Sequence, residues 1–349
     1  MSMLAELVEV VIGVDTHKHT HTAAIVQAAT GAVLARLAVS ADPDGYTELQ
    51  ALAEQHSGLR AWALEGSGGY GAGLARHLAE RGEMVIELDR PVRPKRRAGA
   101  KSDPIDAERA ARDALARTHL AQPKSGAERA ALQMHLTARR AAVEAAADAQ
   151  RELHALVVTA PERVRATFRG QSTRLMITTA SRLRTPRRGD AELTAAVTVL
   201  RTLARRIRFL EDEATAHEAT IRALVRTWRP DLLELPGVGP IVAATVLTSW
   251  SHAGRCRDEA AFAMLAGTAP IPASSGQTVR YRLNRSGDRQ LNRALHVITL
   301  SRLRHDPATR DYAARRRAEG KSDREIQRCL KRYIGRQVYR HLEAGRTAA

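Results

Sequence analysis

Aromatic residues, cysteines and long apolar runs are scarce in this sequence, and each scarcity excludes a class of protein. Phe, Trp and Tyr make up only 3% of the chain, which argues against a protein that stacks successive bases of a single strand on aromatic rings. Cys256 and Cys329 are the only cysteines and lie far apart in the sequence, so we expect neither a disulfide framework nor a cysteine-based zinc site.

No apolar stretch reaches the roughly 18 to 20 residues that are needed to span a bilayer. The N-terminus also lacks the basic and then apolar layout of a signal peptide. We therefore expect a soluble, cytoplasmic protein that makes no membrane contact.

Positive charge is what the sequence has in excess. Its 55 Lys and Arg residues outnumber its 38 Asp and Glu residues, which gives a formal net charge of +17. Attraction to phosphates grows with the number of cations presented, so this balance indicates a protein that works on a polyanion. At 349 residues the chain is too long for one ordinary core, and we expect two or three domains.

Residues 1–122 alternate strand and helix signals, which predicts an α/β domain. Short turns join the first three strands and favour hairpins. Three antiparallel strands followed by alternating helix and strand is the element order of the ribonuclease-H-like, or RuvC-like, fold. The predicted elements are strands at 9–15, 20–28, 32–40, 59–66 and 83–89, and helices at 42–56, 70–82 and 103–117.

Residues 123–228 have the pattern of long helices that form a coiled coil. From Leu193 to Leu224, apolar residues recur in alternating steps of three and four over more than four heptads, and His217 falls within this register as a structural residue. A weaker register runs from Leu132 through Val143 to Val157, and Pro and Gly breaks separate the two. An antiparallel helical pair and a dimerising arm both fit, and an ordinary helical bundle is the alternative.

Residues 229–349 form a third predicted domain, mostly helical with a loop-rich segment and a very basic helical tail. In "LPGVGP" (235–240), Gly237 and Gly239 lie between two apolar helices, as in a helix-hairpin-helix. Backbone N–H groups of such a turn bind a DNA phosphate without reading its sequence. A plain turn between two helices is the alternative interpretation.

Four carboxylates stand where side chains can converge at one edge of a sheet. Asp15 and Glu65 end predicted strands, and Asp103 and Asp106 begin a helix with a spacing that places both on one helical face. Clustered oxygen ligands of this kind suit Mg²⁺ or Mn²⁺, which stabilise the entering and leaving oxygens of a phosphodiester displacement. Helix capping by the two aspartates is the alternative for each taken singly.

Three histidines follow Asp15 closely. His17, His19 and His21 are spaced by two, so on a single strand they would point to one face as a zinc-binding strip. Residues 16–21 are also typical of a turn between two strands, where polar side chains are solvated. We favour the turn, with Asp15 as the functional residue.

A serine pair and a series of arginines mark the C-terminal domain. Ser274 and Ser275 precede Gly276 in a predicted loop, and several arginines follow, the last three at i, i+4 spacing on one predicted helical face. A flexible serine beside phosphate-binding cations is a candidate nucleophile. A basic loop at 90–102 is a second candidate for nucleic-acid contacts. The candidate contact residues are Arg93, Lys95, Arg96, Arg97, Lys101, Arg280, Arg282, Arg285, Arg289 and Arg293.

Several motifs together resemble one family of proteins. "IGVDTHK", "LEGSGGYG" and "KSDPIDA" are similar to the Asp-Glu-Asp-Asp signature of a bacterial insertion-sequence transposase family. "LPGVGPIVAATVL", "DEAAFAMLAGTAPIPASSG" and "NRSGDRQLNRALH" follow in the order expected, so the resemblance covers nearly the whole chain. It implies a RuvC-like domain whose metal-binding acids match Asp15, Glu65, Asp103 and Asp106. It also implies a C-terminal transposase domain whose catalytic serine matches Ser275.

The resemblance further implies a recombinase that excises and inserts its own element. The serine would attack a DNA phosphate to form a phosphoserine link near Mg²⁺, at a site that subunits of a dimer or tetramer can share. Some members are directed by a structured RNA from the element's end, which we expect here as a partner beside double-stranded DNA. A junction endonuclease that hydrolyses DNA with water, and a non-catalytic helix-hairpin-helix DNA-binding protein, are the alternatives.

Overall fold

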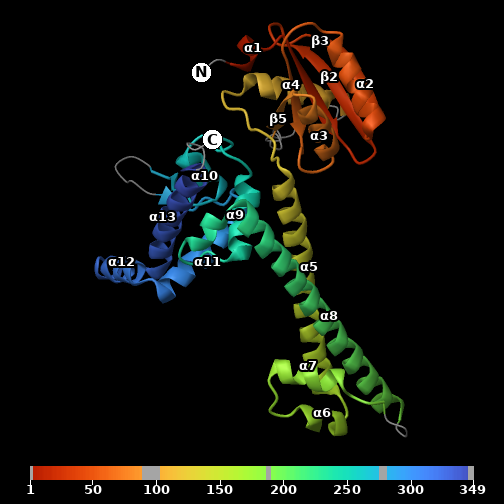
Figure 1. The fold of residues 1–349 in the computed structure, drawn as a ribbon, viewed down its shortest axis with the longest axis vertical. Coiled ribbons are helices and arrows are strands. Elements are labelled where there is room, and N and C mark those ends of the chain that lie inside the picture. The colour runs from red at the N-terminus through yellow and green to blue at the C-terminus, as the bar shows by residue number, and fades with distance from the viewer. Residues whose placement is uncertain (1–2, 89–102, 186–189, 275–280, 345–349) are drawn as a thin grey trace. The chain divides into compact units, whose positions relative to one another are not determined.

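The computed structural model describes residues 3–88, 103–185, 190–274 and 281–344 (Figure 1). The chain divides into two compact units, Met1–Ser125 and Gly126–Ala349. The expected division of the second unit into a coiled-coil domain and a serine domain at residue 228 stays a prediction. Among the described residues, no helix is long and apolar enough to cross a membrane.

A five-stranded mixed sheet forms the centre of the first unit. Its strand order is β3-β2-β1-β4-β5, with β1, β2 and β3 joined as antiparallel neighbours and β4 and β5 added parallel to β1. This arrangement is consistent with the RNase-H-like fold expected from the element order. The strands are β1 (Val10–Thr16), β2 (Thr20–Gln27), β3 (Val33–Ser40), β4 (Arg60–Glu65) and β5 (Met84–Leu88).

Helices cover both faces of this sheet, because its strands alternate apolar side chains between two cores. On one face, α2 (Pro43–Glu54) and α3 (Ala72–Glu80) pack against Ile12 and its neighbours. On the other face, α1 (Leu4–Leu7) and α4 (Asp103–Ala116) pack against Val11 and its neighbours.

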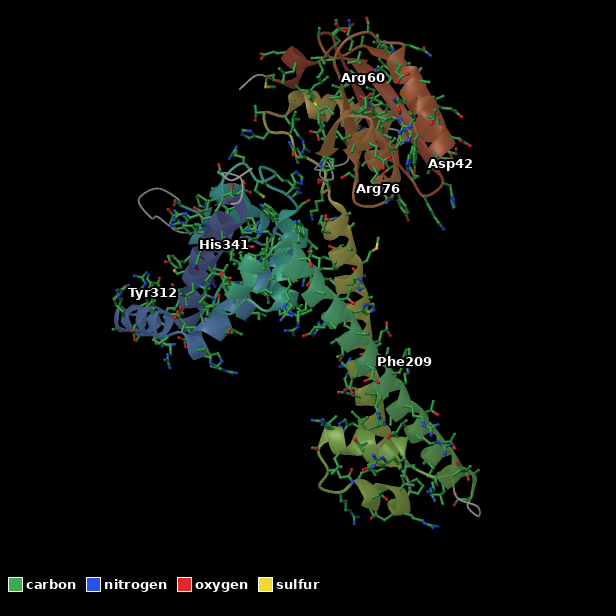
Figure 2. The ribbon with its side chains drawn as sticks, in the orientation of Figure 1. Asp42, Arg60, Arg76, Phe209, Tyr312 and His341 are labelled. Carbon is green, nitrogen blue, oxygen red and sulfur yellow. The ribbon has the colours of Figure 1, made fainter. Side chains whose placement is uncertain are left out.

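Local sequence signals set the ends of these elements. Asp42 starts α2 by accepting a hydrogen bond from the Gly45 N–H at 3.0 Å, with Pro43 in the first helical position (Figure 2). Arg60 at the start of β4 forms an ion pair with Glu83, directly before the neighbouring strand β5. All eight elements predicted for this unit are present within two residues of their expected bounds.

The second unit begins with two long antiparallel helices, α5 (Ala127–Thr159) and α8 (Ala191–Trp228). Their direction follows from cross-contacts: His135 lies beside His217, whereas Gln150, further along α5, lies beside Glu211, further back along α8. The expected helical pair is therefore formed within one chain. Residues of the predicted α8 register that are spaced by seven are buried, namely Leu200, Ile207, Ala214 and Ile221.

The weaker register predicted for α5 is wrong at Val143, which is 43% exposed, because Ala142 and Ala149 face the partner helix instead. Two short helices were also not predicted, α6 (Glu162–Phe168) and α7 (Thr173–Ser181). Both helices add residues to the buried cluster that contains Leu200.

The rest of the second unit is a compact helical core. Its largest buried cluster includes Trp250, Phe262 and Leu295, which lie on three different helices. The elements are the 3₁₀ helix η1 (Pro230–Glu234), α9 (Pro240–Trp250), α10 (Glu259–Leu265), α11 (Arg289–His305), α12 (Pro307–Ala318), α13 (Asp323–Ala344), β6 (Ile271–Pro272) and β7 (Tyr281–Arg282).

Candidate active site

Two of the predicted acids lie at neighbouring strand ends of the first unit. The parallel strands β1 and β4 pair up to Val14 and Leu64, so Asp15 and Glu65 are the next residues at the same edge. Alternation along each strand places both acids on the face covered by α4. The Thr16 hydroxyl donates a hydrogen bond to the Glu65 carbonyl at 2.8 Å and ties the two strand ends together.

Gly13 brings the third acid to this edge. A Cβ atom at Gly13 would lie 2.0 Å from the Ala107 carbonyl oxygen and 2.5 Å from the Ala111 nitrogen, so α4 packs directly on the strand backbone. Asp103 stands one helical turn before Ala107 on the same helix. The close approach at Gly13 therefore holds the first turn of α4 over the end of β1.

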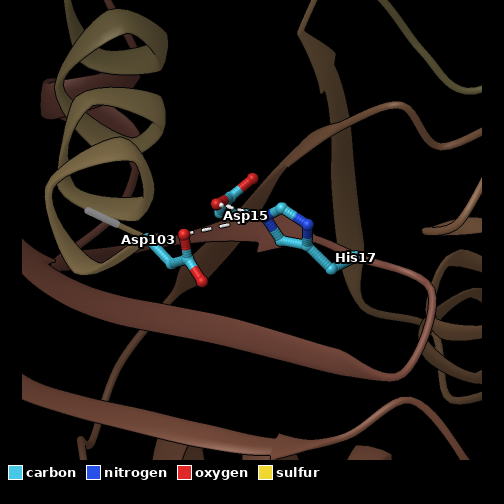
Figure 3. Close-up of side chains that lie close together, drawn as sticks. All are labelled: Asp15, His17 and Asp103. Carbon is cyan, nitrogen blue, oxygen red and sulfur yellow. Dashed lines mark hydrogen bonds and ion pairs between the residues drawn. The ribbon is translucent and has the colours of Figure 1, made fainter. Parts of the chain in front are cut away.

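Asp15, Asp103 and His17 meet at this point (Figure 3). The His17 Nε2 atom lies 3.1 Å from an Asp15 carboxylate oxygen and 3.8 Å from an Asp103 carboxylate oxygen. One ligand atom from each residue lies within 4.8 Å of the other two. Within the described ranges, this is the one group of three such side chains close enough to hold a metal ion.

The charge balance at Asp15 favours a cation. Burial raises the pKa of the Asp15 carboxyl above its usual range, and the charges of Asp103 and Asp106 raise it further, while His17 opposes the shift. The Asp15 side chain is 16% exposed and that of Asp103 is 56% exposed, so the ion site opens to solvent on one side. Two carboxylates and an imidazole at this separation fit a divalent metal ion.

The structure does not bring all four predicted acids into one group. Asp106 is close enough to influence Asp15, but its carboxylate is ion-paired with Arg109 at 2.8 Å. Glu65 lies at the correct edge and on the correct face, outside the three-residue group. Their role as metal ligands stays a prediction.

The three histidines do not act together as a strip. His21 is fully buried on the opposite face of the sheet, where its ring stacks on Tyr46 with centroids 5.7 Å apart, and burial lowers its pKa. His17 follows the strand end and turns to Asp15. His17 was not among the metal ligands predicted from the sequence, although its spacing of two from Asp15 is the signal that both share one face.

In the second unit, the "LPGVGP" segment differs from expectation in its first element. The segment before the turn is the five-residue 3₁₀ helix η1 rather than an α-helix. Gly237 has a positive φ of 80° and packs against the Ile298 carbonyl and Ser301 of α11. Gly239 is exposed at the start of α9, and an added Cβ there would find open space.

Of the predicted nucleic-acid contacts in the C-terminal domain, Arg285, Arg289 and Arg293 line a single hollow. Arg282, on β7, does not. Arg285 precedes the start of α11 at Arg289, so the prediction that it shares one helical face with Arg289 and Arg293 is wrong. All three nevertheless line the same hollow. The remaining candidates lie outside the described residues, namely Ser275, Arg93, Lys95, Arg96, Arg97, Lys101 and Arg280.

Comparison with known families matches both units. A transposase family of the DEDD, IS110 type matches residues 12–160, which include the Asp15 site. The IS116/IS110/IS902 transposase family matches residues 230–314. This chain belongs to the IS110-type family of bacterial insertion-sequence transposases.

Two curated relatives of this transposase family come from insertion elements. One is the uncharacterised 43.6 kDa protein of insertion element IS110 from Streptomyces coelicolor, 35% identical over 127 residues, which cover 36% of this chain and 31% of the relative. The other is the uncharacterised 42 kDa protein of insertion element IS900 from Mycobacterium paratuberculosis, 35% identical over 135 residues, which cover 36% of this chain and 33% of the relative. The chain thus aligns with about a third of each relative's length.

The close packing of α4 on Gly13 gives a testable prediction. Gly13→Ala will push α4 from the sheet and lower the stability of the first unit by about 1–3 kcal/mol, the usual cost of overpacking. Hydrogen exchange of the full chain, read on β1 and α4 peptides, measures this loss of protection. Gly68→Ala is the matched control, because its added Cβ finds nothing within 4 Å. Unchanged protection in both variants would show that α4 does not depend on the contact.

Proposed function

We propose that this protein is a DNA transposase, a recombinase that cleaves and exchanges DNA strands at the ends of an insertion sequence. The observation that carries the proposal is the meeting of Asp15, His17 and Asp103 within the reach of one metal ion, in a chain of the transposase family. Clustered carboxylates at a sheet edge are what phosphoryl transfer with a divalent ion requires.

The metal ion is proposed to be Mg²⁺ or Mn²⁺, held by Asp15, Asp103 and the nearby Asp106 and Glu65. Such an ion supplies positive charge to the phosphate oxygens while a phosphodiester bond is exchanged. His17 keeps its imidazole against Asp15 and orients that carboxylate. Asp103 is the more exposed acid and faces the solvent side from which a strand can approach.

Ser275 is proposed as the nucleophile. Its hydroxyl oxygen forms a bond to a DNA phosphorus as the phosphorus–oxygen bond of the strand breaks, and the freed strand end leaves as a hydroxyl after taking a proton. A second strand hydroxyl then attacks the phosphoserine and restores the serine, so the number of phosphodiester bonds is conserved. The segment that carries Ser275 joins β6 to β7, and these strands pair through Ile271 with Arg282 and Pro272 with Tyr281.

The nucleic-acid contacts are proposed to involve both units. The exposed Gly239 at the start of α9 leaves backbone room for a phosphate, as in a helix-hairpin-helix.

The α5–α8 pair is proposed to act as a coiled-coil arm in a dimer or tetramer, and the exposed Phe209 of α8 (67% exposed, Figure 2) offers an apolar contact for it. A structured guide RNA is the proposed additional partner, in keeping with the net charge of +17.

Strand exchange by the purified full chain tests this function. With Mg²⁺ or Mn²⁺ and DNA across the element junction, with and without element-end RNA, we expect cleaved and rejoined products. Asp103→Asn will remove them, whereas Asp113→Asn on the same helix will not, because Asp113 is engaged with Arg117 at 2.6 Å away from the site. Products that persist in Asp103→Asn, or that need no divalent metal, would overturn the proposal.

A further inference from the structure

The second unit contains a basic hollow of about 610 Å³ between α11, α13, residues 283–287 before α11, and Gly267, which follows α10. We refer to it as the α11–α13 pocket. Its volume lies within the range of about 300–1,000 Å³ that is typical of ligand sites. Asp and Glu are absent from the described residues that line it, whereas six Lys or Arg side chains are present: Arg285, Arg289, Arg293, Arg324, Arg328 and Lys331.

The floor of the pocket is rigid because two glycine loops press together. A Cβ atom at Gly287 would lie 2.3 Å from the Gly267 nitrogen, and the Asp288 N–H donates to the Leu265 carbonyl at 2.6 Å. Asn284 is buried beside them, and its side chain donates to the Met264 carbonyl at 3.3 Å. These contacts join "LAGTAP" to "NRSGD", two motifs that are separate in the sequence.

One cation of the pocket is held in place by an amide. The Lys331 ammonium donates to the Asn292 side-chain oxygen at 3.0 Å, and the Asn292 nitrogen donates to the Ala266 carbonyl at 2.7 Å. Burial, and next the neighbouring charge of Arg328, lower the pKa of Lys331. The positive charge around Lys331 is therefore not balanced by a carboxylate among the described residues that line the pocket.

The other cations lie near acids but form no ion pair with them among the described residues. Hydrogen bonds from Ser322, and also the charge of Arg328, lower the pKa of Glu325, which does not line the pocket. Across the described part of the chain, no ion pair joins Arg285, Arg289, Arg293, Arg324 or Arg328 to a carboxylate. Two acids adjacent to these arginines in the sequence are already engaged. Asp288 is the N-cap of α11 and accepts from the Ser249 hydroxyl at 2.9 Å, and Asp323 is ion-paired with Arg317 at 2.7 Å. Arginines on two helices around one hollow favour the binding of an anion, because its oxygens would accept charge-assisted hydrogen bonds from their guanidinium groups.

We propose that the α11–α13 pocket binds backbone phosphates of a DNA strand, with Arg324, Arg328 and Lys331 as contacts that face those of α11. The hollow receives the sugar-phosphate backbone of one strand rather than a whole duplex. Its lining includes Leu283, the residue after β7, so this part of the wall follows in the chain on the segment that carries Ser275. The choice of DNA as the ligand rests on the proposed function; the phosphate chemistry rests on the pocket alone.

The test is DNA binding by the full chain without divalent metal, where strand cleavage is not involved. Anisotropy of a labelled duplex is followed against salt for the wild type and for Arg324→Gln with Arg328→Gln. The slope of log affinity against log salt will fall by about 0.9 for each lost phosphate contact, or about 1.8 for both. The matched control is Arg205→Gln with Arg208→Gln on α8, which removes the same charge from exposed positions and will change the slope less.

The outcomes separate the alternatives. An equal loss in both double variants, or an unchanged slope in the pocket variant, overturns the pocket. Displacement of the duplex by inorganic phosphate at matched ionic strength reduces it to a small-anion site. An RNA duplex that competes at a much lower concentration than unlabelled DNA of the same sequence overturns the choice of DNA. Circular dichroism checks folding, and Arg324→Gln alone repeats the test if the double variant is perturbed. Metal-dependent strand exchange is measured separately, so its failure leaves this result intact.

Discussion

Asp15→Asn will make the metal-free protein more stable and, at the same time, remove its response to divalent metal. The Asp15 carboxylate is largely buried beside Asp103 and Asp106, and burial and their charges raise its pKa. Between the usual carboxyl pKa and this raised value the folded state binds more protons than the unfolded state, so stability falls as the pH rises through that window. Asp15→Asn lacks this dependence of stability on pH, because the Asn side chain has no carboxyl proton to lose.

With divalent metal bound, the wild type will become more stable than Asp15→Asn. The wild type will gain about 2.7 kcal/mol at a metal concentration of one hundred times the dissociation constant, and the gain will grow with pH because the ion binds the carboxylate form. Thermal unfolding with and without Mn²⁺ measures both effects. Strand cleavage by Asp15→Asn will drop by about 10²- to 10³-fold, because a metal ion contributes several kcal/mol to phosphoryl transfer.

Asp42→Asn is the control for the stability effect, since Asp42 caps α2 and lies at no metal group among the described residues. It will retain the metal response. If the metal-free Asp15→Asn protein is less stable than the wild type, the Asp15 carboxylate stabilises the fold without an ion. The proposed metal site at Asp15 is then wrong.

Local patterns explain how much of the first unit could be predicted. Strands β1 to β5 and helices α2 to α4 follow from alternation, helical periodicity and signals such as Asp42-Pro43, all of which act over a few residues. The strand-end position of Asp15 was predictable for the same reason. The approach of Asp103 to Asp15 was also predicted, but the contact that produces it was not, because Gly13 and Ala107 are far apart in the sequence.

Contacts between distant segments account for what was missed. The helices α6 and α7 are short and flanked by Pro161 and Gly170, and they gain their stability by packing against α5 and α8 rather than from their own sequence. In α13, the spacing of Arg324, Arg328 and Lys331 indicates one basic face. Nothing local shows that this face lies opposite the arginines near α11.

The Ser275 segment gives the second large effect. Ser275→Ala will abolish the covalent link between protein and DNA, while Ser274→Ala will keep it. Loss of a nucleophile in other enzymes lowers the rate by at least about 10⁴-fold, because no other group is placed to attack. The serine must reach a phosphate, and β6 and β7 fix both ends of the segment that carries it.

The measurement is denaturing electrophoresis of labelled DNA after reaction with metal, with the attached residue mapped by mass spectrometry. We expect a nucleotide on Ser275 that disappears in Ser275→Ala and also in Asp103→Asn, since the link needs both the nucleophile and the metal. A link that disappears only in Ser274→Ala would move the nucleophile by one residue. DNA that is cut by the wild type with no protein attached would mean that water attacks the phosphate, and the acids at Asp15 would then belong to a hydrolytic nuclease.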